Sequence, residues 1–310
     1  MKILHYMKRE NSGLARSTLE LVKYEERQGH TVVLKEPGSD MPIYGIEGSG
    51  ADVEVIHSQL PADHYFSTVP KIMEQHGEPL SSVGNGVSMK AICDLSSRVD
   101  AFICMRREEQ PIWNLIKRTY LVRKGIDLET YRHLDGITEK LAGEPSILYY
   151  ENARGIRNPL YLLAAMPEVF QRFPKARLYI YNMTDQRMKE TFQTFVKTCK
   201  MWACGVAGIE GPVDDVNMLL NRIDLVVSCL TPLYARSIEA FGAGKILLCP
   251  GYKEPGYPFP CDLDPSSLAA AIINAWERYE SFDARKWAEE RHDANDMAFE
   301  CVKVYERYVR

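Results

Sequence analysis

The feature that most constrains the fold is an alternation of short apolar runs with amphipathic segments, which occurs twice along the chain. Short β-type runs that alternate with helical segments are typical of parallel α/β sheets. In the first series, a predicted helix over 14–28 ends at Gly29, a residue type that commonly closes helices. The apolar runs of this series are 2–6, 31–34, 53–56, 71–74, 101–104 and 119–122.

The pattern restarts after the polar stretch 133–145. The second series has strand-like runs at 146–150, 177–181, 224–230 and 245–249, and helices at 160–173, at 186–200, from 235 and at 266–279. A chain of 310 residues is about twice the length that usually suggests one domain. We therefore expect an N-terminal domain over 1–140, a C-terminal domain over 141–283, and a helical segment over 284–310.

Composition narrows the function classes. The chain has 38 Lys and Arg and 42 Asp and Glu, which gives a net charge of −4. The net charge therefore does not attract the whole molecule to nucleic acid or to an anionic membrane. No apolar run approaches the ~18 residues needed to span a bilayer. The eight cysteines form no CxxC pair, which favours free thiols over disulfides or zinc. We expect a cytoplasmic protein, with peripheral attachment to a membrane left open.

Polar residues gather where the predicted strands end. In open parallel sheets, ligands bind at the carboxyl ends of the strands. The segments at these ends are rich in glycine, arginine, histidine and hydroxyl groups, which suits an anionic, polyhydroxylated ligand in a cleft between two sheets. These segments are 11–13, 57–59, 76–78, 106–109, 151–157, 210–212, 229–237 and 250–252.

The most specific segment is SCLTPLYARSIEAFGAGKILLCPG, residues 228–251. It predicts a buried strand, a loop, a helix from Ala235, a glycine turn and another strand. Backbone N–H groups at the start of that helix are a natural seat for a phosphate. Glu239 can accept two hydroxyl hydrogen bonds, such as those of a ribose. The alternative is a solvated glutamate in the favourable field near a helix start, but the small residues around Glu239 favour the ligand interpretation.

The same segment resembles the signature of the retaining GT-B glycosyltransferases of the GT4 type, also called glycosyl transferases group 1. That signature is a glutamate, seven residues, then a second glutamate followed by a run of small residues. Glu239 with Ala240, Ala243 and Gly244 matches the second half, and the first glutamate falls at Thr231. The resemblance implies a GT-B fold, with two Rossmann-like domains facing across a cleft and a C-terminal helix that crosses back to the first domain. It also implies that Glu239 holds the nucleotide ribose and that Thr231 lies at the donor sugar.

Other segments carry the same resemblance over nearly the whole chain. The opening strand, loop and helix resemble those of the family, with Gly13 where a glycine pair is usual. KIMEQHGEP resembles the strand that ends in His-Gly, which places His76 at the acceptor side. SILYYENARGIRNPLYLL resembles the strand that precedes a phosphate-binding arginine and lysine. Arg157 falls at the lysine and Asn152 at the arginine, with Arg154 close enough to supply the second cation.

The remaining candidate residues surround the same donor. The resemblance implies that His76 orients the acceptor or hydrogen-bonds the donor sugar. Gly211 either borders the base or belongs to an ordinary loop. His5 and His57 have similar positions at strand ends but weaker motif support, and we interpret them as structural. The residues expected to line the phosphate and sugar end of the donor are Thr231, Tyr234, Ala235, Arg236 and Ser237.

No metal and no cofactor other than the donor substrate are expected. The sequence has no DxD motif and no Asp, Glu and His cluster with metal-like spacing. Departure of a nucleoside diphosphate builds negative charge, which a metal-independent enzyme offsets with fixed cations and helix dipoles. Arg154 and Arg157 would provide the cations with forked donors.

The sequence therefore predicts a glycosyltransferase that moves a sugar from a UDP- or GDP-sugar type of donor to an acceptor hydroxyl, with retention and without a metal. The acceptor stays open between a glycan, a lipid-linked sugar, a small molecule and a modified DNA base, and the oligomeric state is also open. The basic stretch 105–124 is the only feature that favours the DNA base, and a solvated helix face is the commoner explanation of such a stretch. The missing glutamate at Thr231 and the single Gly13 favour a non-catalytic nucleotide-sugar-binding protein. A dinucleotide oxidoreductase is disfavoured, because no GxGxxG follows the first strand.

Overall fold

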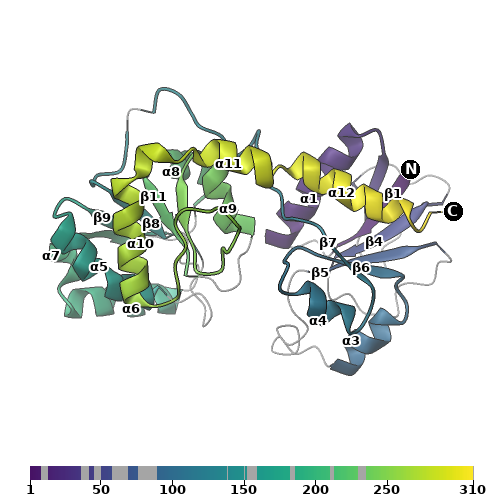
Figure 1. Cartoon of the computed structure of the whole chain (residues 1–310), viewed down its shortest axis with the longest axis horizontal. Helices are drawn as coiled ribbons and strands as arrows, with labels where there is room; N and C mark the ends of the chain where they lie inside the picture. Colours follow the sequence, from purple (N-terminus) through teal and green to yellow (C-terminus); the bar gives the residue numbers. More distant parts are fainter. Residues whose placement is uncertain are drawn as a thin grey trace. The chain divides into compact units, whose positions relative to one another are not determined.

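The structure, a computed structural model, divides the chain into two compact units. Unit 1 comprises Met1–Asp127 and Arg291–Arg310, and unit 2 comprises Leu128–Glu290 (Figure 1). The chain first passes from unit 1 to unit 2 after Asp127, earlier than the boundary near residue 140 that the sequence predicts. The residues that the structure describes are 1–7, 13–35, 42–44, 50–57, 69–75, 89–137, 139–149, 151, 159–181, 186–209, 213–229 and 235–309.

Unit 1 is built on a seven-stranded sheet with the order β3-β2-β1-β4-β5-β6-β7. Its strands are β1 (Lys2–Tyr6), β2 (Thr31–Lys35), β3 (Pro42–Tyr44), β4 (Val53–His57), β5 (Lys71–Gln75), β6 (Ala101–Cys104) and β7 (Thr119–Leu121). The six predicted strands are confirmed, and they pair in parallel. The antiparallel strand β3 was not predicted. It is short and begins with a proline, which strands accept at the edge of a sheet.

In its described residues, unit 1 has the helices α1 (Gly13–Arg27), α3 (Met89–Ser96), α4 (Gln110–Asn114) and α12 (Ala294–Glu306). Apolar side chains of α1 and α12 are buried in a core that they share with this sheet. α12 comes from the C-terminal end of the chain and lies beside α1 (Figure 1). The prediction that the C-terminal helix returns to the first part of the chain is confirmed. The core that joins both helices to the sheet includes Ile3, Leu21, Val22, Val53, Val55, Ile103, Met297 and Tyr305.

Unit 2 has a fully parallel sheet with the order β10-β9-β8-β11-β12. Its strands are β8 (Ser146–Tyr149), β9 (Arg177–Ile180), β10 (Val206–Ile209), β11 (Leu225–Val227) and β12 (Ile246–Leu248). Its helices are α5 (Leu160–Arg172), α6 (Gln186–Thr198), α7 (Met201–Cys204), α8 (Val216–Asn221), α9 (Ala235–Gly242) and α10 (Pro265–Glu277), with α11 (Ala284–Arg291) at the crossing to unit 1. In the described parts of the chain, no helix is long and apolar enough to cross a membrane.

The two segments of unit 1 that lie next to the junctions with unit 2 are hydrogen-bonded to each other through their backbones. Ile126 N–H donates to the carbonyl of His292 (2.8 Å), and Ala294 N–H donates to the carbonyl of Ile126 (3.1 Å). The approach is so close that a Cβ atom added at Gly125 would lie 2.6 Å from Ala294 Cα. Glycine is therefore required at position 125, and this part of the crossing is fixed by backbone contacts within unit 1.

His292 in this crossing gives a testable pH dependence. The imidazole is 3% exposed and its Nδ1 lies 2.9 Å from the Lys124 carbonyl. Burial lowers the pKa of His292 to about 4, and the hydrogen bond to Lys124 opposes that shift. An unfolded histidine has a pKa near ~6.5. The stability contributed by the neutral ring is therefore fully present above pH ~6.5. It is lost as the pH falls from there to about 4, the pKa of the folded state.

We expect His292→Asn, whose side-chain amide can still donate to the Lys124 carbonyl, to resist acid better than the native chain. The native protein should lose about 3 kcal/mol more than the variant between pH 7 and pH 4, from the size of the pKa difference. Urea unfolding at several pH values measures this. An equal acid-side loss in both proteins would contradict the assignment of a buried neutral imidazole.

Candidate functional site

Helix α9 stands at the carboxyl edge of the unit 2 sheet. It follows β11 and precedes β12, two adjacent parallel strands, so its first residues lie near the edge at which β8 and β11 end. The side chains of Ile238, Ala240 and Phe241 are fully buried. After the helix, Gly244 takes a φ of +75°, a left-handed conformation that suits glycine and reverses the chain into β12. The buried apolar residues of α9 and the glycine turn after it thus determine how the helix packs and where it ends.

A buried carboxylate ties the start of α9 to two strands. Glu151, which follows β8, is 1% exposed. Its Oε1 accepts hydrogen bonds from Ser228 Oγ at the end of β11 (2.7 Å) and from Ser237 Oγ in the first turn of α9 (2.7 Å). The two hydroxyl oxygens are 3.3 Å apart. Because a desolvated carboxylate is costly without donors, this three-residue cluster holds β8, β11 and α9 together.

The negative charge of Glu151 helps to raise the pKa of two neighbouring thiols. Burial, and secondly the Glu151 carboxylate, raise the pKa of Cys229 to about 12. The same two causes raise the pKa of Cys249 further. Both cysteines follow strands at this edge, β11 and β12, and both stay protonated at neutral pH. Neither thiol is therefore a nucleophile or a metal ligand in this state.

Glu239 lies two residues after Ser237 on the same helix. At about 100° per residue, its Cα is about 200° around the helix axis from that of Ser237. Ser237 is bonded to Glu151, so Glu239 occupies the other side of α9. Its side chain is 4% exposed. In such a shielded position, a hydrogen bond that a carboxylate accepts is stronger than in water.

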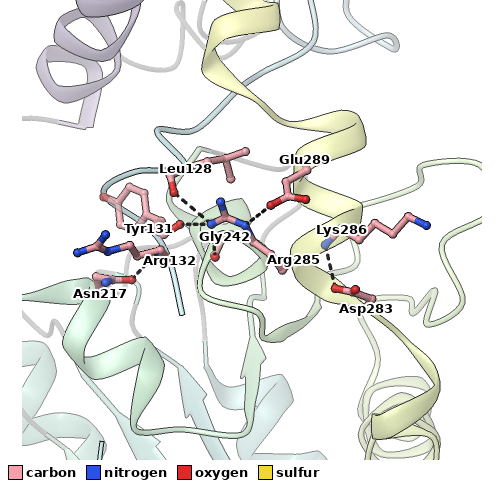
Figure 2. A network of polar contacts seen from close by, with 9 residues as sticks. All are labelled: Leu128, Tyr131, Arg132, Asn217, Gly242, Asp283, Arg285, Lys286 and Glu289. Atoms are coloured by element: carbon pink, nitrogen blue, oxygen red, sulfur yellow. Dashed lines mark hydrogen bonds and ion pairs between the residues drawn. The ribbon is translucent and has the colours of Figure 1, made fainter. Parts of the chain in front are cut away.

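The far end of α9 is held by Arg285 of α11, as Figure 2 shows. Arg285 Nη1 donates to the carbonyl of Gly242, the last residue of α9, at 2.9 Å. The same nitrogen contacts the carbonyls of Leu128 (3.1 Å) and Tyr131 (2.9 Å). Its Nε pairs with Glu289 at 2.7 Å. One guanidinium thus connects the end of α9 to the first residues of unit 2, and its charge suits the negative end of the helix.

An aromatic cluster completes the support of α9. The ring of Phe241 lies 5.3 Å from that of Tyr252 and 5.6 Å from that of Tyr257, centroid to centroid. Trp287 Nε1 donates to the hydroxyl of Tyr252 at 2.6 Å, and the hydroxyl of Tyr257 donates to the carbonyl of Leu247. Both polar tips are thus bonded inside the core, as buried tyrosine and tryptophan require.

The structure brings together only part of the predicted site. Ser237 and Glu239 lie on α9 as predicted, and Ala235 and Arg236 form its first two residues. Gly13 opens α1 in unit 1. The other predicted site residues lie outside the described parts of the chain, and they are His76, Asn152, Arg154, Arg157, Gly211, Thr231 and Tyr234.

Three residues that organise this site were not predicted from the sequence. Glu151 and Ser228 each come just after a strand, and a carboxylate and a hydroxyl at the ends of adjacent strands were the signal that could have found them. Arg285 lies 43 residues after its partner Gly242, in a helix with two other basic residues. Nothing in the sequence distinguishes it from Lys286 beside it.

Comparison with known proteins gives matches in structure and not in sequence. No family model and no curated protein sequence matches the chain. A glycosyltransferase from Rickettsia africae ESF-5 superposes with a TM-score of 0.75 at 13% identity, over 100% of this chain and 98% of the other. Sucrose-phosphate synthase from Thermosynechococcus elongatus gives 0.74 at 14%, over 99% and 98%. Anabaena HepE in complex with UDP-glucose gives 0.69 at 14%, over 99% and 100%. The chain therefore has the GT-B fold, as predicted.

The cluster of Glu151, Ser228 and Ser237 predicts a graded set of stability losses. Glu151→Ala leaves two buried hydroxyls without their acceptor, and we expect it to destabilise unit 2 by about 3 kcal/mol. Ser237→Ala removes one donor and should cost about 1 kcal/mol. Glu151→Gln keeps an oxygen acceptor and should lie between them. Urea unfolding of the three variants measures the order, and a Glu151→Ala loss no larger than that of Ser237→Ala would contradict it.

The role of Arg285 predicts a large difference between neighbouring residues of α11. Arg285→Met leaves the carbonyls of Leu128, Tyr131 and Gly242 without this donor, and we expect a loss of about 3 kcal/mol in the stability of unit 2. Lys286→Met is the matched control, because the Lys286 side chain is 68% exposed. It should change stability by less than about 0.5 kcal/mol. Similar losses in both variants would show that Arg285 does not anchor α9.

Proposed function

We propose that this protein is a glycosyltransferase that moves a sugar from a nucleoside-diphosphate sugar of the UDP-glucose type to an acceptor hydroxyl. The observation that carries the proposal is the placement of Glu239. It lies on a helix that is bonded at both ends, at the carboxyl edge of a parallel sheet, in a GT-B fold. Ligands of open α/β sheets bind at this edge. A structure with the same fold holds UDP-glucose.

In the proposed donor site, each part of the nucleotide sugar has its own partners. Glu239 accepts hydrogen bonds from the ribose hydroxyls. The first amides of α9, at Ala235 and Arg236, point their N–H groups toward the diphosphate. Arg154 and Arg157 offset its charge, with Asn152 beside them. Gly211 borders the base, and the sugar end is lined by Thr231 and Tyr234. The hydroxyl of Ser237, expected at the sugar, is bonded to Glu151 inside the protein and supports the helix instead.

In the proposed reaction, the bond between the anomeric carbon and the diphosphate oxygen breaks, and a bond from that carbon to the acceptor oxygen forms. The proton of the acceptor hydroxyl passes to the leaving diphosphate. Negative charge on that group is stabilised by the arginines and by the dipole of α9, so that no metal is needed. His76 orients the acceptor, and Gly13 permits close approach of the backbone. The configuration at the anomeric carbon is retained.

In the basic stretch 105–124, three of the six Lys and Arg residues are exposed, Arg107, Arg118 and Arg123, so the stretch offers only part of its charge to a DNA acceptor. Arg106 forms an ion pair with Glu109, and the Lys124 ammonium donates to Ser17. Trp113 is 1% exposed and packs in the core, so it is not free to stack on a base. Arg118 lies over the ring of Tyr120. A protein that binds DNA through such a stretch needs its cations and aromatic faces toward solvent.

The donor site is tested by a thermal-shift panel with UDP, GDP, ADP and TDP, with and without EDTA. A nucleotide at 100 times its dissociation constant stabilises the native state by about 2.7 kcal/mol, which raises the unfolding midpoint by on the order of 5 °C. We expect a selective shift with UDP that EDTA leaves unchanged. In Glu239→Ala, the affinity for UDP should fall at least about 100-fold, because hydrogen bonds to a charged group are lost.

Two controls make this test specific. Glu280→Ala removes an exposed carboxylate elsewhere in unit 2 and should leave the UDP shift intact. Release of UDP from UDP-glucose, followed with the same proteins, separates a transferase from a binding protein. A shift with no release for any offered acceptor would support the non-catalytic alternative, and no shift at millimolar nucleotide would overturn the donor site.

A further inference from the structure

Helix α4 covers an edge of the unit 1 sheet. In the described part of the chain, β7 is the last strand of that sheet, and it pairs with β6 on one side only. On its other side, the N–H of Thr119 donates to Asn114 Oδ1 (2.8 Å), and the carbonyl of Thr119 accepts from Gln110 Nε2 (3.1 Å). Both of these side chains belong to α4, so the helix satisfies the open edge of β7.

A buried ring determines which face of α4 is turned outward. Trp113 is 1% exposed, and its ring packs edge-on against that of Phe102 in β6, with a centroid distance of 5.2 Å. Ile112 and Leu115 lie three residues apart, a spacing that places two side chains next to each other on a helical turn. Since Trp113 is turned into the core, Ile112 and Leu115 are presented to solvent, and both are exposed.

Leu115 is the most exposed large apolar side chain that the structure describes, at 86%. Leu121, at the end of β7, is exposed as well. A single exposed leucine is ordinary, whereas several apolar side chains gathered on one surface mark a docking site. We call Ile112, Leu115 and Leu121 the apolar edge.

Basic side chains accompany the apolar edge along the chain. Segment 105–124 has six Lys and Arg and two acidic residues, in a chain whose net charge is −4. Arg107 precedes α4, Arg118 lies between Leu115 and Leu121 in the sequence, and Arg123 follows Leu121. All three arginines are exposed, as is one acidic residue of the segment, Glu108. This part of an acidic molecule is therefore both basic and apolar.

The C-terminal end of the chain adds a further cation to this group. The guanidinium of Arg307, an exposed residue that follows α12, lies 5.0 Å from the centroid of the Tyr120 ring. The guanidinium of Arg118 lies 5.2 Å from the same ring. The hydroxyl of Tyr120 is 3.2 Å from that of Tyr308. An aromatic ring of β7 is thus placed beside two exposed arginines.

These properties together identify one kind of occupant. Anionic lipid headgroups attract each Lys or Arg near the membrane surface, and apolar side chains gain free energy in the acyl region below. Nucleic acid offers phosphates but no apolar medium for Leu115. Addition of a strand from a second copy is disfavoured, because both backbone groups of Thr119 are already bonded to α4.

We propose that the apolar edge, with Arg107, Arg118, Arg123 and Arg307, binds unit 1 to the surface of a bilayer that contains anionic phospholipids. Leu115 enters the boundary of the acyl region, and the arginines stay among the headgroups. The ring of Tyr120 lies at the interface, where tyrosine is enriched in membrane proteins. The acidic remainder of the chain is repelled by the same headgroups, which favours one orientation. This binding does not depend on the donor site.

Flotation of the full chain with lipid vesicles tests the proposal. The vesicles consist of phosphatidylcholine alone, or of phosphatidylcholine with about one third phosphatidylglycerol, at ~0.1 M and at ~1 M salt. We expect binding only to the vesicles with phosphatidylglycerol, and a loss of most of it at the higher salt. No binding to those vesicles, or equal binding to both kinds, would overturn the proposal.

Two pairs of variants locate the binding surface. Leu115→Ser should lower the partition coefficient at least about tenfold, because one leucine side chain no longer leaves water. Leu19→Ser is the matched control, since Leu19 is an exposed leucine of α1 in the same unit, and it should leave the partition unchanged. Arg118→Gln should lower the partition about fivefold, and Arg172→Gln, an exposed arginine of unit 2, should not change it. Equal losses within either pair would overturn the assignment to this surface.

Leu115→Trp reports insertion directly. Tryptophan is favoured at membrane interfaces, so we expect this variant to bind the vesicles with phosphatidylglycerol more tightly than the native chain does. Emission of the added indole should shift to the blue and be quenched by brominated lipids, and Leu19→Trp should show neither effect. Emission at position 115 that vesicles leave unchanged would overturn insertion.

The same variants distinguish the other occupants. Self-association of the native chain in sedimentation, abolished by Leu115→Ser, would assign the surface to a second copy and overturn the proposal. Binding of a DNA duplex that Arg118→Gln weakens, without binding to vesicles, would assign it to nucleic acid with the same consequence. The unfolding midpoint of Leu115→Ser should equal that of the native chain, because the replaced side chain is exposed, so a loss of vesicle binding is not a loss of fold.

Discussion

A carboxylate buried at the end of a parallel strand must find donors on neighbouring elements, and this requirement organises unit 2. Removal of an ion from water costs several kcal/mol unless hydrogen bonds compensate. Glu151 meets the requirement with the hydroxyls of Ser228 and Ser237, which belong to another strand and to α9. The position of α9 is thus set by the charge of a residue that precedes it by more than 80 positions in the chain.

Unit 1 meets the same requirement with imidazoles. Glu25 and Glu74 are as buried as Glu151, but their partners are His5 and His57 instead of serines. A serine hydroxyl donates at any physiological pH, so the Glu151 cluster is insensitive to pH in this range. The two units therefore surround their buried carboxylates with different side chains, hydroxyls in unit 2 and imidazoles in unit 1.

Much of the fold could be predicted because buried parallel strands appear in the sequence as short apolar runs between helical segments. The runs at KILHY and KILLC illustrate this, since both became strands. β3 was missed because three residues that begin with proline carry no such pattern. In the site, Glu239 was singled out as a candidate from the small residues after it, and its role stays a prediction. Glu151 and Ser228 were missed because their meaning depends on strands that become neighbours only in the folded sheet. His5 and His57, interpreted as structural from the sequence, are buried in unit 1 and contact each other.

α9 has eight residues, and a helix of that length is not stable alone in water. Its geometry is imposed by the anchors at Ser237 and Gly242, which bracket Glu239 on the helix. None of these anchors needs to touch a donor in order to determine where its ribose would bind. The departure from the family signature at Thr231 lies before the helix and outside this set of anchors. In the proposed donor site, a change at position 231 would alter what the sugar meets, whereas the placement of Glu239 depends on Glu151 and Arg285, so donor binding and sugar selection would be separable.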